Sequence, residues 1–252
     1  MANFYEFFAG GGMARAGLGP DWQCLLANDF DPKKAASYAT NWGADHLRVG
    51  DVAALTPADL PAGADLAWAS FPCQDLSLAG AGAGLKGERS GTFWPFWKLI
   101  KALGDEGRAP RLVVLENVCG ALSSHDGKDF AAISSALSNN GYRFGAVVIN
   151  AVHFLPQSRP RLFIIGVRKS SPIPRALIAG GPEGEWHPSA LVEAYGKLSK
   201  RAQSSWEWWR LPAPSARTSI FADLVEDEPH GVTWHTAAET KKLLGMMNPL
   251  NL

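Results

Sequence analysis

Short apolar runs recur along the first two thirds of the chain, and a polar or amphipathic stretch separates each run from the next. The runs are four to seven residues long and rich in aromatic and branched aliphatic residues. Such runs are typical of strands buried on both faces of a parallel sheet. They predict strands over residues 4–8, 24–29, 65–70, 112–115, 144–150 and 162–167.

Helices are predicted between these strands. Asp31 is placed to cap a helix that has Pro32 in its first turn, and Asn140-Gly141 closes another helix. Strands that alternate with helices predict an α/β fold built on a mostly parallel sheet. The predicted helices cover residues 13–18, 32–41, 94–103 and 129–140.

The composition and the hydrophobic pattern of the chain change from about residue 170. Prolines, glycines and tryptophans recur there, and the strand periodicity fades. Helices are predicted over residues 218–225 and 236–247, and the second begins with Thr236 followed three positions later by Glu239, the pattern of a capping box. We therefore expect one domain over residues 1–170 and the start of a second, smaller one over residues 171–252.

Composition adds little support for a nucleic-acid partner. The 252 residues contain 24 Lys and Arg against 24 Asp and Glu, whereas a compact non-specific nucleic-acid binder is usually basic. Any surface that binds nucleic acid must therefore be a local stripe of basic residues. Three scattered cysteines (Cys24, Cys73, Cys119) are too few for a disulfide framework or a zinc site, so no metal is expected. Without a signal peptide or a long apolar span, the chain is expected to be cytoplasmic and to have no membrane partner.

Cys73 is the first candidate for chemistry. It lies just beyond the predicted strand 65–70, and ligands in open α/β sheets collect outside the carboxyl ends of strands. Pro72 stiffens the backbone before the thiol, and a glycine-rich segment typical of a lid or binding loop follows over residues 79–87. A buried structural thiol is the alternative interpretation, but this context favours a reactive one.

The glycines at residues 10–12 are the second candidate. They separate a strand from a helix, and Asp29 ends the next strand roughly 20 residues later, which is the layout of a cofactor crossover. Their spacing departs from Gly-x-Gly-x-x-Gly, so a cofactor without a pyrophosphate is favoured. An ordinary tight turn with a capping aspartate is the alternative.

Charged residues also stand at the ends of two later strands. Glu116 directly follows the run 112–115, and Arg159 and Arg161 stand one residue apart before the run 162–167, where they are expected to point the same way. A helix-capping glutamate and a pair of surface arginines are the alternatives.

In chain order, six short motifs resemble those of the cytosine-5 DNA methyltransferases of bacterial or phage type. The resemblance covers roughly residues 3–168 and implies a Rossmann-like S-adenosylmethionine-dependent methyltransferase fold, with a mixed, mostly parallel sheet followed by the start of a target-recognition domain. The chain has Glu6 where the family usually has Asp, and Met13 where it often has Gly. The motifs are FAGGG (8–12), ANDFD (27–31), GDV (50–52), FPCQDLS (71–77), ENV (116–118) and QSRPR (157–161).

The resemblance implies a role for each motif. Asp29 would hold the ribose, Phe30 would pack on the adenine, and Asp51 would accept from the adenine amino group. The full implied binding set for S-adenosyl-L-methionine is Phe8, Ala9, Gly10, Gly12, Asp29, Phe30, Asp51, Val52 and Pro72.

The implied chemistry is attack by Cys73 on ring carbon 6 of a cytosine flipped out of duplex DNA. Glu116 would act at ring nitrogen 3, Arg161 at the ring carbonyl oxygen, and Arg159 would help to hold Cys73. The loop after Cys73 would close as a lid. The implied substrate-binding residues are Gln74, Ser77 and Arg89, the last on a DNA phosphate.

Two alternatives stay open. A tRNA cytosine-5 methyltransferase shares this catalytic set, but its nucleophile turn usually begins Pro-Pro-Cys, and Phe71-Pro72-Cys73 therefore favours DNA. The second alternative is a chain that is inactive without another subunit. The family's last motif, a helix that folds back under the cofactor, has no counterpart here, so we expect a truncated chain, a split enzyme with a second chain, or a decayed gene product. Alone, the chain is expected to bind the cofactor weakly and to methylate poorly or not at all.

Overall fold

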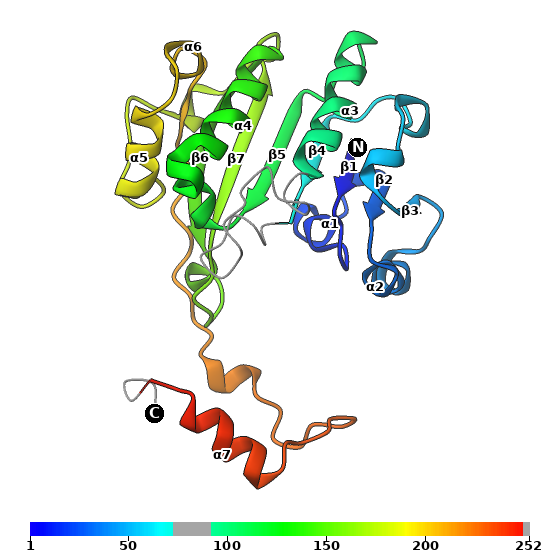
Figure 1. Cartoon of the computed structure of the whole chain (residues 1–252), viewed down its shortest axis with the longest axis vertical. Coiled ribbons are helices and arrows are strands. Elements are labelled where there is room, and N and C mark those ends of the chain that lie inside the picture. Colours follow the sequence, from blue (N-terminus) through cyan, green and yellow to red (C-terminus); the bar gives the residue numbers. More distant parts are fainter. Residues whose placement is uncertain (73–91, 249–252) are drawn as a thin grey trace.

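A seven-stranded mixed sheet organises the chain, for which the computed structural model describes residues 1–72 and 92–248 (Figure 1). The strand order is β3-β2-β1-β4-β5-β7-β6, and β7 runs antiparallel to both of its neighbours while the other pairings are parallel. The predicted mixed, mostly parallel sheet is therefore confirmed. The strands are β1 Ala2–Phe7, β2 Trp22–Asp29, β3 Leu47–Val49, β4 Leu66–Ala69, β5 Leu112–Asn117, β6 Tyr142–Asn150 and β7 Pro160–Arg168.

The four predicted helices of this part are confirmed to within two residues at each end. They are α1 Met13–Leu18, α2 Pro32–Trp42, α3 Phe93–Asp105 and α4 Lys128–Asn139. Asp31 caps α2 as predicted, because its carboxylate accepts from the Lys33 amide at 2.8 Å. Short 3₁₀ turns fill several connections: η1 Val52–Ala54, η2 Pro57–Asp59, η5 Cys119–Leu122, η6 Ser124–Gly127 and η7 Ala151–His153.

The main core lies between the sheet and helices α3 and α4. Aromatic rings dominate it; Phe7 of β1 and Phe96 of α3 meet edge to face with centroids 5.0 Å apart. Each fully buried ring of this size contributes roughly 1.5–3 kcal/mol of transfer free energy. The opposite face of β1 and β2 packs against α1 and α2 through a smaller cluster around Phe4 and Tyr38. This packing fixes the strand ends, where the candidate residues stand.

Residues beyond β7 continue to pack on the edge strand β6. Trp206 is buried against Phe144, with ring centroids 5.4 Å apart, and the Glu207 amide donates to the Phe144 carbonyl at 2.7 Å. The domain boundary near residue 170 stays a prediction, but this stretch lies on the body of the protein. Its elements are η8 Arg175–Leu177, β8 Ile178–Ala179, α5 Ser189–Gly196, α6 Lys200–Gln203 and β9 Trp208–Trp209.

From about residue 212 the chain forms an exposed arm that extends away from the sheet (Figure 1). The predicted helix over residues 218–225 is wrong: only the 3₁₀ turn η9 Phe221–Leu224 forms, because a short segment without a packing partner does not repay helix nucleation. The second prediction is confirmed as α7 Ala237–Gly245, with the Thr236 capping box in place. Within residues 1–72 and 92–248, no helix is long and apolar enough to span a membrane.

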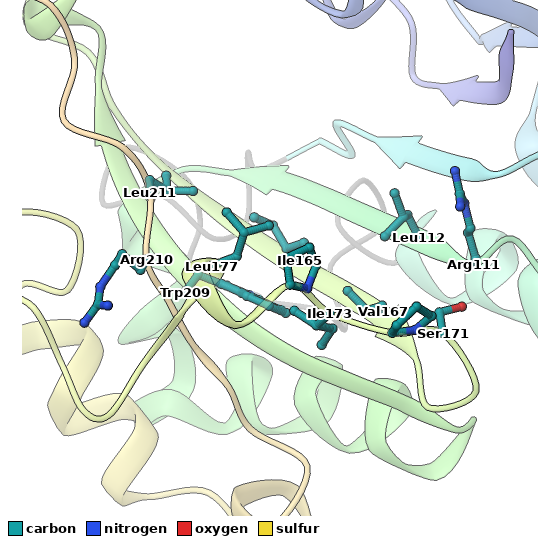
Figure 2. A pocket seen from close by; sticks show the side chains of 12 residues that line it. Arg111, Leu112, Ile165, Val167, Ser171, Ile173, Leu177, Trp209, Arg210 and Leu211 are labelled. Carbon is teal, nitrogen blue, oxygen red and sulfur yellow. The ribbon is translucent and has the colours of Figure 1, made fainter.

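An apolar cavity of about 390 Å³ lies at the amino end of β5, between the sheet and the segment that follows β7 (Figure 2). Arg111 and Arg210 stand on opposite sides of it, paired with Asp65 at 3.1 Å and Glu183 at 2.5 Å. Because Glu116 is at the other end of β5, this cavity is separate from the candidate site. Its lining includes Leu112, Ile165, Val167, Ile173, Leu177 and Trp209.

Candidate active site

The antiparallel strand β7 brings an acid and a guanidinium together at one edge of the sheet. Asn117 at the end of β5 pairs with Leu162 near the start of β7. Glu116 and Arg161 therefore meet: Arg161 Nε lies 3.1 Å from Glu116 Oε1, and each side chain is 22% exposed. A partly exposed pair of this kind can still receive a substrate on its open side.

Asn117 connects this pair to the segment between β4 and the candidate nucleophile. Its Nδ2 donates to the Phe71 carbonyl at 3.4 Å, and its Oδ1 accepts from the Val118 amide at 2.8 Å. Phe71 is itself buried against Phe93 of α3. The chain is thus anchored two residues before Cys73, next to Glu116. Four predicted site residues lie outside the described residues: Cys73, Gln74, Ser77 and Arg89.

Arg159 lies differently from Arg161. It precedes the first residue of β7, and its side chain is exposed. Its backbone is held by Asn150, whose Oδ1 accepts from the Arg159 amide at 2.8 Å. The structure therefore brings Arg161 to Glu116 and leaves Arg159 on the surface beside the β6–β7 connection.

The glycine turn after β1 has an unusual backbone. Phe8, a residue with a side chain, adopts a left-handed φ of 59°, and Gly10 and Gly12 follow with φ of 55° and 84°. The Gly12 amide closes the turn by donating to the Ala9 carbonyl at 2.8 Å. Left-handed backbone at a bulky residue costs on the order of 1–3 kcal/mol and is concentrated at functional sites. This backbone conformation therefore favours a functional role for the turn over a simple chain reversal.

Asp29 ties this turn to the end of β2. Its Oδ2 accepts from the Gly10 amide at 2.8 Å and its Oδ1 from the Asp31 amide at 2.9 Å. The adjacent Phe30 is 72% exposed, which leaves a flat apolar surface for a planar ligand. A carboxylate oxygen has two acceptor positions, so Asp29 keeps capacity for a hydroxyl group.

The GDV motif stands beside Asp29. The Gly50 amide donates to the Asp29 carbonyl at 2.9 Å. Asp51 is exposed and accepts from the Ala53 amide at 2.8 Å, while Val52 is buried beneath it. The ends of β1, β2 and β3 thus gather the predicted cofactor residues at one edge, and Pro72 follows β4 at the same edge.

Glu6 is a residue whose role the sequence did not predict. It lies next to the carboxyl end of β1 with 1% exposure, and its Oε1 accepts from the amides of Ala14 and Arg15 at 3.1 and 3.4 Å. Its Oε2 is buried with no hydrogen-bond partner among the described residues. Burial raises the pKa of Glu6 to about 7, although the hydrogen bonds from Arg15 and Ala14 oppose the shift. In the sequence, only the position of this single acid within an aromatic strand indicated that it would be buried.

Replacing Glu6 with Gln is expected to flatten the pH dependence of stability. An acid whose pKa is raised by folding stabilises the folded state below its unfolded pKa of about 4.5, and this contribution is lost as pH rises through about 7. The loss is at most about 3 kcal/mol. Urea unfolding of wild type and Glu6→Gln at pH 5 and pH 8 measures it. An identical pH dependence in both proteins would contradict the assignment.

The chain matches the family described as C-5 cytosine-specific DNA methylase over residues 2–244. It is 30% identical over 210 residues to Type II methyltransferase M.BsuFI of Bacillus subtilis. The matched region covers 81% of this chain and 49% of that protein. It is 32% identical over 173 residues to Type II methyltransferase M.Bsp6I of Bacillus sp. (strain RFL6), covering 67% and 53%. The chain thus spans about half the length of the curated relatives that it matches.

Solved structures share the fold. The crystal structure of S. pombe Dnmt2 methyltransferase matches with a TM-score of 0.56 at 22% identity, over 69% of this chain and 53% of that one. Entamoeba histolytica methyltransferase EhMeth matches with a TM-score of 0.52 at 17% identity, over 68% and 54%. The predicted Rossmann-like methyltransferase fold is therefore confirmed. Since the family match spans nearly the whole chain, the protein belongs to the C-5 cytosine-specific DNA methylase family.

Proposed function

We propose that this chain carries the catalytic half of a DNA cytosine-5 methyltransferase that uses S-adenosyl-L-methionine. The observation that carries the proposal is the Glu116–Arg161 pair beside the anchored approach to Cys73. An acid, a guanidinium and a thiol at one sheet edge are the groups that addition to a pyrimidine ring requires. The names of the Type II relatives support the same reaction class.

In the proposed reaction, the Cys73 thiolate forms a bond to carbon 6 of the cytosine. The electron pair of the 5,6 double bond shifts toward carbon 5 and nitrogen 3. Protonation of nitrogen 3 by Glu116 neutralises the negative charge that develops there. Arg161 holds both Glu116 and the ring carbonyl oxygen by charge. Carbon 5 then accepts the methyl group that the bound cofactor would supply, with a neutral thioether as the leaving group. Carbon 5 loses its proton to a base, nitrogen 3 returns its proton to Glu116, and the thiolate leaves carbon 6 as the 5,6 double bond re-forms.

The residues at the glycine turn fit the proposed cofactor. S-adenosyl-L-methionine, when bound, supplies an electrophilic methyl group. The open left-handed turn at Gly10 and Gly12 allows close backbone approach, Asp29 retains acceptor capacity for a ribose hydroxyl, and exposed Phe30 offers a face for the adenine. Asp51 lies next to this position for the adenine amino group.

Duplex DNA, the proposed substrate, can be distinguished from tRNA directly. We expect transfer of a labelled methyl group to duplex DNA to exceed transfer to tRNA by at least roughly tenfold, because Phe71 replaces the first proline of the tRNA-type turn. Both substrates are tested with the same enzyme preparation and label. Equal or greater labelling of tRNA would contradict the DNA assignment and favour the tRNA enzyme.

A further polypeptide segment that completes the enzyme is part of the proposal. Apolar side chains remain exposed on the arm after residue 212, including Phe221, Trp234 and Met246, and relatives contain about as much chain again. We propose that the exposed apolar side chains of this arm pack against a further polypeptide segment, either a second chain or more of this one. Turnover by the purified chain at rates of the order of 1 s⁻¹, within the ordinary range of enzymes, would contradict this part. Bacterial DNA as substrate implies a cytoplasmic, nucleoid-associated location.

A further inference from the structure

The carbonyl of Gly11, at the tip of the glycine turn, is held by the far end of helix α2. Trp42 Nε1 donates to the Gly11 carbonyl at 3.1 Å, and Asn41 Nδ2 donates to the same oxygen at 3.2 Å. Trp42 and Asn41 are the last residues of α2, and they belong to none of the six motifs. Two side-chain donors on one loop carbonyl fix the direction of that peptide group.

The turn has a slot that fits the indole ring. A Cβ atom on Gly12 would lie 2.2 Å from Trp42 Nε1 and 2.5 Å from Trp42 Cδ1, so Trp42 occupies space that any side chain at position 12 would need. The Arg15 guanidinium lies over the indole ring, 4.8 Å from its centroid. The ring is therefore held between the turn and α1 in one orientation.

Helix α2 also starts at the opposite end of the same site. Its cap, Asp31, donates its amide to Asp29 Oδ1, and Asp29 Oδ2 holds the Gly10 amide. The helix thus connects the ribose and adenine end of the proposed cofactor site to the turn that faces the methionine end. A displacement of Trp42 would change the position of the Gly11 peptide group without breaking a hydrogen bond of Asp29.

We propose that Trp42, assisted by Asn41, is a positioning residue that holds the Gly10–Gly12 turn in its cofactor-binding shape. This rests on the proposed function, because the turn is taken to face S-adenosyl-L-methionine. Trp42 itself does not touch the cofactor. It acts through the Gly11 peptide group, whose fixed direction keeps the Gly10 and Gly12 amides in their hydrogen bonds to Asp29 and Ala9.

The test compares Trp42→Phe, Asn41→Ala and the double variant with wild type, and uses Trp22→Phe as the control. Trp22 is a half-buried tryptophan at the opposite end of β2. Amide hydrogen exchange without ligand is expected to quicken about three- to tenfold at Gly10 and Gly12 in Trp42→Phe, the effect of one lost hydrogen bond. Exchange in α3 should not change, and the double variant should show the largest effect.

Calorimetric titration with S-adenosylhomocysteine gives the second readout. Its Kd is expected to rise about three- to tenfold in Trp42→Phe and not in Trp22→Phe. Unchanged exchange at the turn, or an unchanged Kd in a wild type that binds, overturns the positioning role alone. Faster exchange throughout the chain would show that Trp42 acts only on global stability. A wild type with normal turn protection and no binding overturns the proposed cofactor site instead.

Discussion

Replacing Cys73 with Ser is expected to abolish the covalent adduct that we expect the wild-type chain to form with duplex DNA containing 5-fluorocytosine. Fluorine at carbon 5 cannot leave as a proton does, so the bond from sulfur to carbon 6 persists after methyl transfer. A serine hydroxyl is a far weaker nucleophile at neutral pH than a thiolate. Loss of adduct and of methyl transfer by at least roughly 1,000-fold is the expected size when a covalent nucleophile is removed.

The structure supplies the matched control for this experiment. The other two cysteines are free, and burial raises the pKa of both thiols, that of Cys24 to about 11. Neither forms much thiolate near neutral pH. Cys119→Ser should therefore keep the adduct, which a gel-shift of denatured protein–DNA complexes detects at saturating cofactor. An adduct in Cys73→Ser, or its loss in Cys119→Ser, would contradict the assignment of the nucleophile.

Gly12→Ala is expected to cause the largest loss of stability at the glycine turn, about 2–5 kcal/mol. The left-handed φ of 84° costs an alanine roughly 1–2 kcal/mol, and the added methyl would lie 2.2 Å from Trp42 Nε1, an overlap that costs about 1–3 kcal/mol to relieve. The free energy of unfolding in urea measures the sum. Binding of S-adenosylhomocysteine should weaken in parallel, because the turn must move away from the indole.

Gly17→Ala, five residues further on, is the control for this substitution. Gly17 lies in α1, and a Cβ there would meet nothing within 4 Å. Alanine is favoured over glycine inside a helix, so this variant should be more stable than wild type by about 0.5–1 kcal/mol. If both alanine variants changed stability in the same direction, the steric account of the turn would fail.

The strands were predictable where burial on both faces made the sequence apolar. The run 112–115 and strand β5 illustrate this, since alternate positions of β5 face the α3–α4 core and the opposite face is also mostly apolar. Strand β3 was missed because Leu47–Val49 is short and largely exposed, and only its pairing with β2 defines it. Helix α5 was missed for a related reason: its packing on β6 depends on contacts distant in sequence.

The candidate site was predictable where motifs stand at strand ends. Glu116 and Arg161 were expected to converge, and the register of β5 with β7 brings them together. Glu6 and Trp42 were not found, because their roles depend on which amide or carbonyl lies opposite them. Sequence periodicity shows which face of an element is buried but not which polar atom that face meets.

The reversed direction of β7 limits where such a site can be built. Arg161 comes from the amino end of its strand and Glu116 from the carboxyl end of its neighbour, so the two meet only because the strands oppose each other. In an all-parallel sheet with the same sequence, the guanidinium would start at the far edge, roughly 20 Å away along a six-residue strand. Grafting this chemistry onto a purely parallel scaffold would therefore require the cation to come from another part of the chain.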